Sequence, residues 1–190
     1  MDARENVSEN QAERLNVGDR APDVEVCFAS GLHSSLGDHW RQRPLLLALT
    51  RHLGCAFCRE QLLALKDRWD EFQTAGVGVL GVTMRSVNDT LDFQRHLQLP
   101  FDLIADPERT VYQAYGAERG SAWQVLGLPV WPRALKATLR GGMGMPRGDI
   151  MQLHASFLID TAGVIRLAHY PDSSADQLSC SQCMEAVPEA

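Results

Sequence analysis

One stretch of the chain places a short apolar run, a pair of cysteines, an amphipathic stripe and a second apolar run in direct succession. Residues 45–50 carry no charge, which is typical of a β-strand covered on both faces. Beyond Cys55 the apolar residues recur every three or four positions and predict one amphipathic helix, ended by Gly76. This stripe consists of Leu62, Leu65, Trp69 and Phe72. Residues 77–83 form the second apolar run, so the succession predicts two parallel strands joined by a helix, the basic unit of an α/β fold.

The neighbouring segments continue this alternation of strands and helices. Residues 23–28 alternate polar and apolar side chains, which predicts a peripheral strand. Ser86 stands where a helix through about Leu97 needs a capping residue, and residues 101–104 are typical of a short strand. These segments therefore add a further strand, helix and strand around the central unit.

Two later signals predict a helix and a hairpin. Asp106 precedes a proline, so it is expected to cap a helix that runs through about Tyr115. The apolar residues 157–159 and 164–170 are separated by the sequence Asp-Thr-Ala-Gly, which predicts a β-hairpin.

The 190 residues are enough for one ordinary domain with short extensions. We expect a polar N-terminal tail over residues 1–17 and a domain over residues 18–170. An inserted helical segment over about 117–152 carries a local excess of basic residues, which predicts either a docking surface or a helix packed on the edge of the sheet. Residues 171–190 form an acidic C-terminal tail.

The charge balance argues against several classes of partner. The formal net charge of −6 disfavours binding to nucleic acid or to an anionic membrane. No uncharged apolar run approaches the roughly 18 residues of a membrane span. The N-terminal residues are charged where a signal peptide would be apolar, so we expect a cytoplasmic protein. Thiols are kept reduced there, and paired cysteines more often serve catalysis or metal binding than structural bridges.

The most informative motif is the Cys-x-x-Cys pair, Cys55 and Cys58, at the predicted strand-to-helix junction. A thiolate at a helix N-terminus is stabilised by unpaired N–H groups, so Cys55 is the expected nucleophile. Cys58 lies one helical turn further and is the expected resolving thiol. Arg51, His52 and Arg59 are expected to add positive charge around the pair, although the two arginines could equally be solvated flanks.

Other uses of the pair stay open at this level. Together with a second pair, Cys180 and Cys183, it could supply four thiolate ligands for zinc, and His52 could supply a local ligand. Zinc ribbons separate their pairs by about 15–20 residues, whereas 121 residues intervene here. Unreactive packing and a redox-sensing module without turnover are the remaining alternatives.

The second pair lies in the acidic tail, where surrounding carboxylates disfavour a thiolate. Two hypotheses follow for Cys180 and Cys183. The pair is either a relay that reduces a Cys55–Cys58 disulfide by thiol exchange, or an incidental exposed pair on a flexible tail. Cys27, on the polar face of its strand, is expected to be a spare, partly covered thiol.

The order of elements resembles the thioredoxin fold, and three motifs narrow the resemblance. GDRAPDVEV, ADPERTVYQAYG and ASFLIDTAGVIRLAHY resemble the thioredoxin-like branch that contains peroxiredoxins. More closely, RHLGCAFCRE followed by GDIMQL, FLID and AHY resembles the peroxiredoxin-like subgroup of the AhpC/TSA superfamily. The resemblance implies a central mixed sheet flanked by helices and a thiol-disulfide oxidoreductase or peroxide reductase acting through Cys55 and Cys58. It implies no organic cofactor. The implied partners are a small peroxide or disulfide and a thiol donor such as thioredoxin or glutathione, and the resemblance also admits a homodimer.

Two positions depart from the peroxiredoxin pattern. Peroxiredoxins carry proline and threonine seven and three residues before the reactive cysteine, where this chain has Ala48 and His52. The hydroxyl that would orient a peroxide is therefore missing. His154 stands where peroxiredoxins have an arginine, and it is expected either to contact Cys55 as a proton carrier or to be a polar residue at a strand edge.

Overall fold

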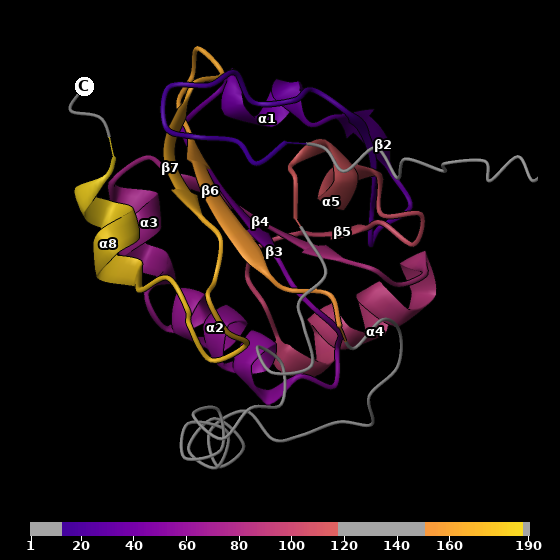
Figure 1. Ribbon diagram of the computed structural model, residues 1–190. Helices are drawn as coiled ribbons and strands as arrows, with labels where there is room; N and C mark the ends of the chain where they lie inside the picture. Colours follow the sequence, from indigo (N-terminus) through magenta and orange to yellow (C-terminus); the bar gives the residue numbers. More distant parts are fainter. Residues whose placement is uncertain (1–12, 118–150, 188–190) are drawn as a thin grey trace, which may run out of the picture.

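The computed structural model describes residues 13–117 and 151–187 (Figure 1). Most of the expected N-terminal tail and nearly all of the expected insert over 117–152 lie outside these residues. None of the described helices combines the length and apolar character needed to cross a bilayer. The described elements are, in chain order, β1 (Glu25–Phe28), β2 (His33–Ser35), α1 (Gly37–Trp40), β3 (Leu45–Leu49), α2 (Ala56–Asp67), α3 (Trp69–Thr74), β4 (Gly78–Thr83), α4 (Val87–Leu97), β5 (Leu103–Ala105), α5 (Thr110–Ala114), β6 (Ala155–Ile159), β7 (Ile165–His169) and α8 (Cys180–Glu185).

In the described part of the chain the strands form one seven-stranded sheet in the order β2-β1-β5-β4-β3-β6-β7. Strand β3 lies in the interior of the sheet, parallel to β4 and antiparallel to β6. Strand β4 is parallel to β5, while β1 is antiparallel to both β5 and β2. Strands β6 and β7 form the predicted hairpin. The mixed sheet and the crossover from β3 to β4 are therefore confirmed.

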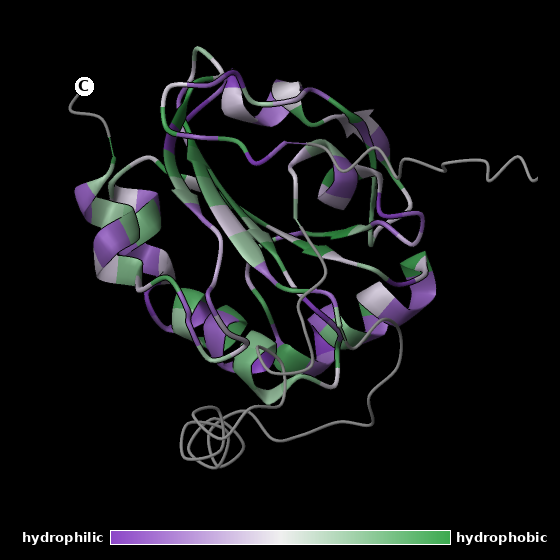
Figure 2. Ribbon diagram, viewed as in Figure 1, coloured by the Kyte–Doolittle hydropathy of each residue, from purple (hydrophilic) through white to green (hydrophobic). Residues whose placement is uncertain are grey.

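Helices cover both faces of this sheet (Figure 1). Leu46 and Ala48 of β3 pack in one apolar cluster with residues of α2, α3, α4 and α8. Leu45, Leu47 and Leu49 point to the opposite face and pack with residues of α1 and α5. Burial on both faces explains why β3 lacks polar residues, and Figure 2 shows apolar colouring along the central strands but mixed colouring along α2 and α4. The thioredoxin-like α/β fold is confirmed.

The amphipathic stripe after the first cysteine pair is divided between two helices. Arg68 has φ −110° and ψ 18°, so α2 ends before it and α3 begins after it. Leu62, Leu65 and Phe72 nevertheless lie buried in the same cluster, because both helices keep their apolar side toward the sheet. The prediction of one continuous helix is therefore wrong at Arg68. The expected burial of the stripe is confirmed for Leu62, Leu65 and Phe72.

Helix α5 begins later than the Asp106 signal predicts. The carboxylate oxygens of Asp106 accept hydrogen bonds from the N–H groups of Thr110 and Val111, each at 2.8 Å. An intervening turn contains Arg109, which has a left-handed φ of 59°. The prediction that Asp106 is the N-cap is therefore wrong, because Arg109 holds that position and the helix starts at Thr110. Asp106 still satisfies two N–H groups of the first turn from outside the helix.

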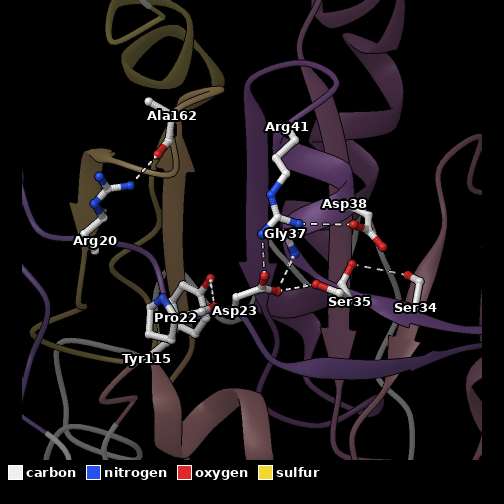
Figure 3. A network of polar contacts seen from close by, with 10 residues as sticks. All are labelled: Arg20, Pro22, Asp23, Ser34, Ser35, Gly37, Asp38, Arg41, Tyr115 and Ala162. Atoms are coloured by element: carbon white, nitrogen blue, oxygen red, sulfur yellow. Dashed lines mark hydrogen bonds and ion pairs between the residues drawn. The ribbon is translucent and has the colours of Figure 1, made fainter.

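The segment before β1 is tied to the domain by polar side chains (Figure 3). Asp23 accepts the N–H of Gly37 at 2.8 Å and thereby caps the start of α1. The same carboxylate pairs with the guanidinium of Arg41 at 2.7 Å. The hydroxyl of Tyr115 donates to the carbonyl oxygen of Pro22 at 3.0 Å. These contacts fix residues 22 and 23 against α1 and α5.

Candidate active site

The first cysteine pair lies where β3 leads into α2. Cys55 is the N-cap of α2, with φ −73° and ψ 118°, and Cys58 lies in the first turn of the helix. Both residues are buried, with 5% and 1% of their surface exposed. The predicted junction is confirmed, and it brings Cys55 next to N–H groups that have no partner within the helix.

The end of β3 is held in place by buried hydroxyl groups. The hydroxyl of Thr50 donates to the carbonyl oxygen of Val82 on β4 at 2.9 Å. The hydroxyl of Tyr112 donates to the carbonyl oxygen of Thr50 at 2.6 Å and lies 3.0 Å from that of Val82. Because these groups are shielded from water, their hydrogen bonds are stronger than at a surface. These hydrogen bonds therefore fix the position of Thr50, from which the turn with the cysteines begins.

The pKa values of the two thiols are shifted in opposite directions. A hydrogen bond with Cys58 is the main cause that lowers the pKa of Cys55 to about 6, against the opposing effect of burial. The charge of Arg51 and the N–H groups of Cys58 and Phe57 lower this pKa further. Burial raises the pKa of Cys58 well above its usual value. Cys55 is therefore mainly a thiolate at neutral pH, and Cys58 keeps its proton.

Arg51 is turned inward and is not a solvated flank, with 4% of its surface exposed. Its Nε donates to the carbonyl oxygen of Gln152 at 2.8 Å, and its Nη1 lies 3.6 Å from the sulfur of Cys55. Its main-chain N–H donates to the sulfur of Cys58 at 3.2 Å. One residue thus contacts both thiols and delivers a positive charge to the first.

His52 differs from the expectation that it adds positive charge. Burial, followed by the neighbouring charge of Arg51, lowers the pKa of His52 to about 4. The imidazole is therefore neutral at pH 7. Its Nδ1 atom is buried and has no hydrogen-bond partner among residues 13–117 and 151–187. His52 thus contributes a polar ring beside the site and no charge.

Arg59 contacts an aromatic ring of α4, and His154 lies buried directly before β6. The guanidinium of Arg59 lies over the ring of Phe93 on α4, 5.6 Å from its centroid. His154 is buried, not exposed at a strand edge, and its Nε2 lies 2.5 Å from the carbonyl oxygen of Asp176. Burial lowers the pKa of His154 to about 4, so it too is neutral at pH 7.

The segment between β7 and α8 covers the first cysteine pair. Ala175 packs in one cluster with Cys55, Cys58 and Phe57. The side-chain amide of Gln177 donates to the carbonyl oxygen of Phe57. This cover was not predictable from the sequence, because Gln177 and Phe57 are 120 residues apart and the segment is polar.

The second cysteine pair is buried, which contradicts the alternative of an exposed pair on a flexible tail. Cys180 and Cys183 are 8% and 2% exposed and pack in the same cluster as Leu65 of α2. They lie on α8, which begins with a capping box between Ser179 and Gln182. The acidic composition of this region predicted solvent exposure, but it is the opposite face of α8 that carries the polar residues.

Cys27 on β1 is partly buried, as expected for a spare thiol. All five cysteines lie in the described part of the chain, and none of them forms a disulfide there. Among residues 13–117 and 151–187, no three His, Cys, Asp or Glu side chains are grouped so that they could hold a metal ion. The candidate zinc ligands of both pairs belong to these residues, so the arrangement does not match a four-thiolate site.

Comparisons with known proteins agree with this fold. The sequence profile of the AhpC/TSA family matches residues 17–168. A "Putative peroxiredoxin" of Mycobacterium tuberculosis is 32% identical over 104 residues, which cover 55% of this chain and 66% of the relative. A peroxiredoxin of Aeropyrum pernix is 26% identical over 164 residues, covering 82% of this chain and 55% of the relative. The chain thus spans less than two thirds of the length of either relative.

Solved structures show the same architecture. Peroxidoxin BcpB of Mycobacterium tuberculosis superposes with a TM-score of 0.67 at 17% identity, covering 91% of this chain and 94% of that one. A peroxiredoxin-like protein of Aquifex aeolicus gives a TM-score of 0.67 at 15% identity, covering 92% and 87%. Since the family profile matches most of the chain and the fold agrees, this protein belongs to the AhpC/TSA family.

Proposed function

We propose that this protein is a thiol-dependent oxidoreductase that reduces a peroxide or a disulfide through Cys55 and Cys58. The observation that carries the proposal is the contact between the Arg51 guanidinium and the Cys55 sulfur, with a second buried thiol one helical turn away. The names of the relatives, two of which are peroxiredoxins, support the same chemistry. No organic cofactor is needed for it.

With a peroxide, the Cys55 thiolate attacks one oxygen of the O–O bond. A sulfur–oxygen bond forms, the O–O bond breaks, and the leaving alkoxide or hydroxide takes up a proton. Cys55 is thereby oxidised to a sulfenic acid. Cys58 then attacks the Cys55 sulfur, a disulfide forms, and the hydroxyl group leaves as water with the proton of Cys58. An external thiol donor, such as thioredoxin or glutathione, returns two electrons to the disulfide.

With a disulfide substrate, the same two cysteines act in the same order. The Cys55 thiolate attacks one sulfur of the substrate and forms a mixed disulfide, and one substrate thiol leaves. Cys58 then releases the second thiol and closes the Cys55–Cys58 disulfide. The absence of a threonine at position 52 favours this second candidate, because no hydroxyl group is present there to orient a peroxide.

Arg51 supplies the charge that the family places elsewhere in the sequence. Peroxiredoxins have an arginine at the position of His154, which is neutral in this chain because burial lowers its pKa to about 4. The buried guanidinium of Arg51 instead lies 3.6 Å from the reactive sulfur. We propose that Arg51 stabilises the thiolate and the anion that leaves during attack.

Oxidant consumption by matched cysteine variants tests the proposal. Wild-type protein should consume peroxide in the presence of a thiol donor, and oxidised glutathione in the presence of a thiol donor other than glutathione, over many turnovers. Cys55→Ser should abolish consumption, and Cys58→Ser should stop after the first step with a trapped sulfenic acid or mixed disulfide on Cys55. Cys27→Ser, a change outside both pairs, is the matched control and should keep the wild-type rate.

The outcomes separate the candidates. Faster consumption of peroxide than of disulfide identifies a peroxidase, and the reverse identifies a disulfide reductase. One equivalent of oxidant consumed without further turnover, with every donor tried, would replace the enzyme by a redox-sensing protein. Full activity in Cys55→Ser would overturn the assignment of the nucleophile. We propose the cytoplasm as the compartment, since the cycle needs a reduced thiol pool, and a homodimer as the assembly to test.

A further inference from the structure

The second cysteine pair shares two features with the first. Cys180 is the first residue of α8 and Cys183 the fourth, so their side chains are one turn apart on the same face of the helix. The guanidinium of Arg68 interacts with Cys180 and donates to the hydroxyl of Ser181 at 3.0 Å. Each pair therefore has an arginine beside its first cysteine and a more deeply buried second cysteine.

The segment that leads into α8 runs along α2. Ala175 packs with Cys55 and Cys58 at the start of this helix. Cys180 and Cys183 pack with Leu65, two turns further along it. Figure 1 shows this segment passing beside α2 before it enters α8. The second pair is thus held on the helix whose first turn carries the first pair.

The length of the segment from Ala175 to Cys180 decides whether the two cysteine pairs can come into contact. A helix rises about 1.5 Å per residue, so the seven residues from Cys58 to Leu65 span roughly 10 Å. Cys180 follows Ala175 by five residues, which can extend over at most about 17 Å. With Ala175 kept in place as an anchor, Cys180 can therefore reach back to the start of α2. Such a short tether also gives the two pairs a high effective concentration.

The seat of α8 is incompletely filled. A pocket of about 490 Å³, open to solvent, lies between α2, the sheet and residues 175–183, and its lining includes Gln61 of α2, Ala48 of β3 and both cysteines of α8. The part of α8 that faces this pocket lacks close-packed neighbours, so α8 loses fewer packing contacts on leaving α2 than a fully packed helix would. Its capping box is internal to the helix and moves with it.

We propose that Cys180 and Cys183 form a second dithiol that reduces the Cys55–Cys58 disulfide within the same chain. This inference rests on the proposed function, which supplies that disulfide. Its net result is the transfer of two electrons and one proton from the second pair to the first. An external thiol donor then reduces the Cys180–Cys183 disulfide.

The exchange takes place in two balanced steps. The Cys180 thiolate attacks the sulfur of Cys55, the more exposed member of its pair. A Cys180–Cys55 bond forms, the Cys55–Cys58 bond breaks, and Cys58 leaves and takes up a proton. Cys183 then loses its proton and attacks the sulfur of Cys180, which closes the Cys180–Cys183 disulfide. Cys55 leaves as a thiolate, and the first pair is reduced.

A trapping experiment with Cys183→Ser tests this route. The variant cannot complete the second step, so the mixed disulfide between Cys55 and Cys180 should accumulate. The full-length protein is treated with one equivalent of hydrogen peroxide or oxidised glutathione, alkylated at successive times and digested for peptide mass spectrometry. Wild type should pass the oxidation to Cys180–Cys183, and Cys55→Ser should show no early Cys180–Cys183 disulfide. Cys27→Ser is the control that leaves both pairs intact.

Each outcome decides a separate point. A Cys55–Cys180 cross-link that forms at a rate independent of protein concentration supports the proposal. A Cys55–Cys58 disulfide that persists while Cys180 and Cys183 stay alkylatable overturns the proposal and leaves the proposed function intact. A cross-link that forms only between two copies of the chain also overturns it. If the Cys55–Cys58 disulfide never forms with either oxidant, the proposed function itself fails.

Discussion

The guanidinium of Arg51 and the thiol of Cys55 are 3.6 Å apart in the buried start of α2. Arg51 is held in this position by the carbonyl oxygen of Gln152, which accepts from its Nε at 2.8 Å. The guanidinium therefore cannot turn to solvent without losing a buried hydrogen bond, at a cost of about 1–3 kcal/mol. The positive charge at the sulfur is thus a fixed property of the fold.

Replacing Arg51 should raise the pKa of Cys55. In the wild type this pKa is lowered to about 6, with the hydrogen bond to Cys58 as the largest cause and Arg51 as a further one. Arg51→Met keeps much of the side-chain volume and removes the charge, so we expect a rise of about one pH unit or more. The pH dependence of iodoacetamide alkylation of Cys55 measures this midpoint directly.

Arg59→Met is the matched control for this change. Its guanidinium lies over the ring of Phe93, so the alkylation midpoint of Cys55 should stay close to pH 6. Equal shifts in the two variants would mean that the thiolate responds to net charge and not to the contact with Arg51.

The lowered pKa of Cys55 also predicts how stability depends on pH. The folded state holds the pKa near 6, whereas the unfolded thiol titrates near its ordinary value of 9.0. The unfolded chain therefore binds more protons between these values, and stability gained from the thiolate rises with pH. This contribution to stability is fully present above the pKa of the unfolded thiol and is lost as the pH falls through about 6.

Urea unfolding of reduced protein should reveal this gain. From pH 6 to pH 8.5 the free energy of unfolding of wild type should rise relative to Cys55→Ser, by on the order of 2–3 kcal/mol. The comparison stops at pH 8.5 because Cys58, whose pKa burial raises, acts with the opposite sign above pH 9. Parallel stability curves for the two proteins would contradict the lowered pKa.

His52 and His154 predict a second pH dependence, on the acid side. Burial is the main cause that lowers the pKa of each to about 4, below the ordinary value of 6.5. The unfolded chain therefore takes up protons first as the pH falls, and stability present above pH 6.5 is lost between pH 6.5 and 4. Imidazole signals in NMR spectra of the folded protein should show both rings neutral down to about pH 5. A protonation midpoint above pH 6 for either ring would sink the prediction.

The elements with strong local signals were predictable from the sequence. Strand β3 was predictable because its residues form an uninterrupted apolar run, which is typical of a strand covered on both faces. Helix α4 begins where Ser86 provides a cap, since its hydroxyl accepts the N–H of Asp89 at 3.2 Å. The position of Cys55 at the start of α2 follows from the change in apolar spacing. Each signal lies within a few residues of the feature that it predicts.

The features that the sequence did not reveal depend on contacts between distant residues. The inward orientation of Arg51 depends on the carbonyl of Gln152, 101 positions away. The neutral state of His52 depends on burial by the folded chain, which composition does not indicate. The burial of Cys180 and Cys183 depends on a seat against α2 that an acidic segment gives no reason to expect. Electrostatics of the site were therefore less predictable than its position.

Tyr112→Phe should slow the chemistry as well as destabilise the fold. The change removes the hydroxyl that bonds the carbonyl oxygen of Thr50 at 2.6 Å and frees the end of β3 that leads to the cysteines. We expect a loss of about 1–2 kcal/mol in stability and a several-fold lower alkylation rate of Cys55. Tyr115→Phe is the matched control, because its hydroxyl bonds Pro22 and not the cysteine turn (Figure 3). It should reduce the free energy of unfolding by a similar amount without slowing alkylation, whereas equal slowing in both variants would show that the effect follows general stability.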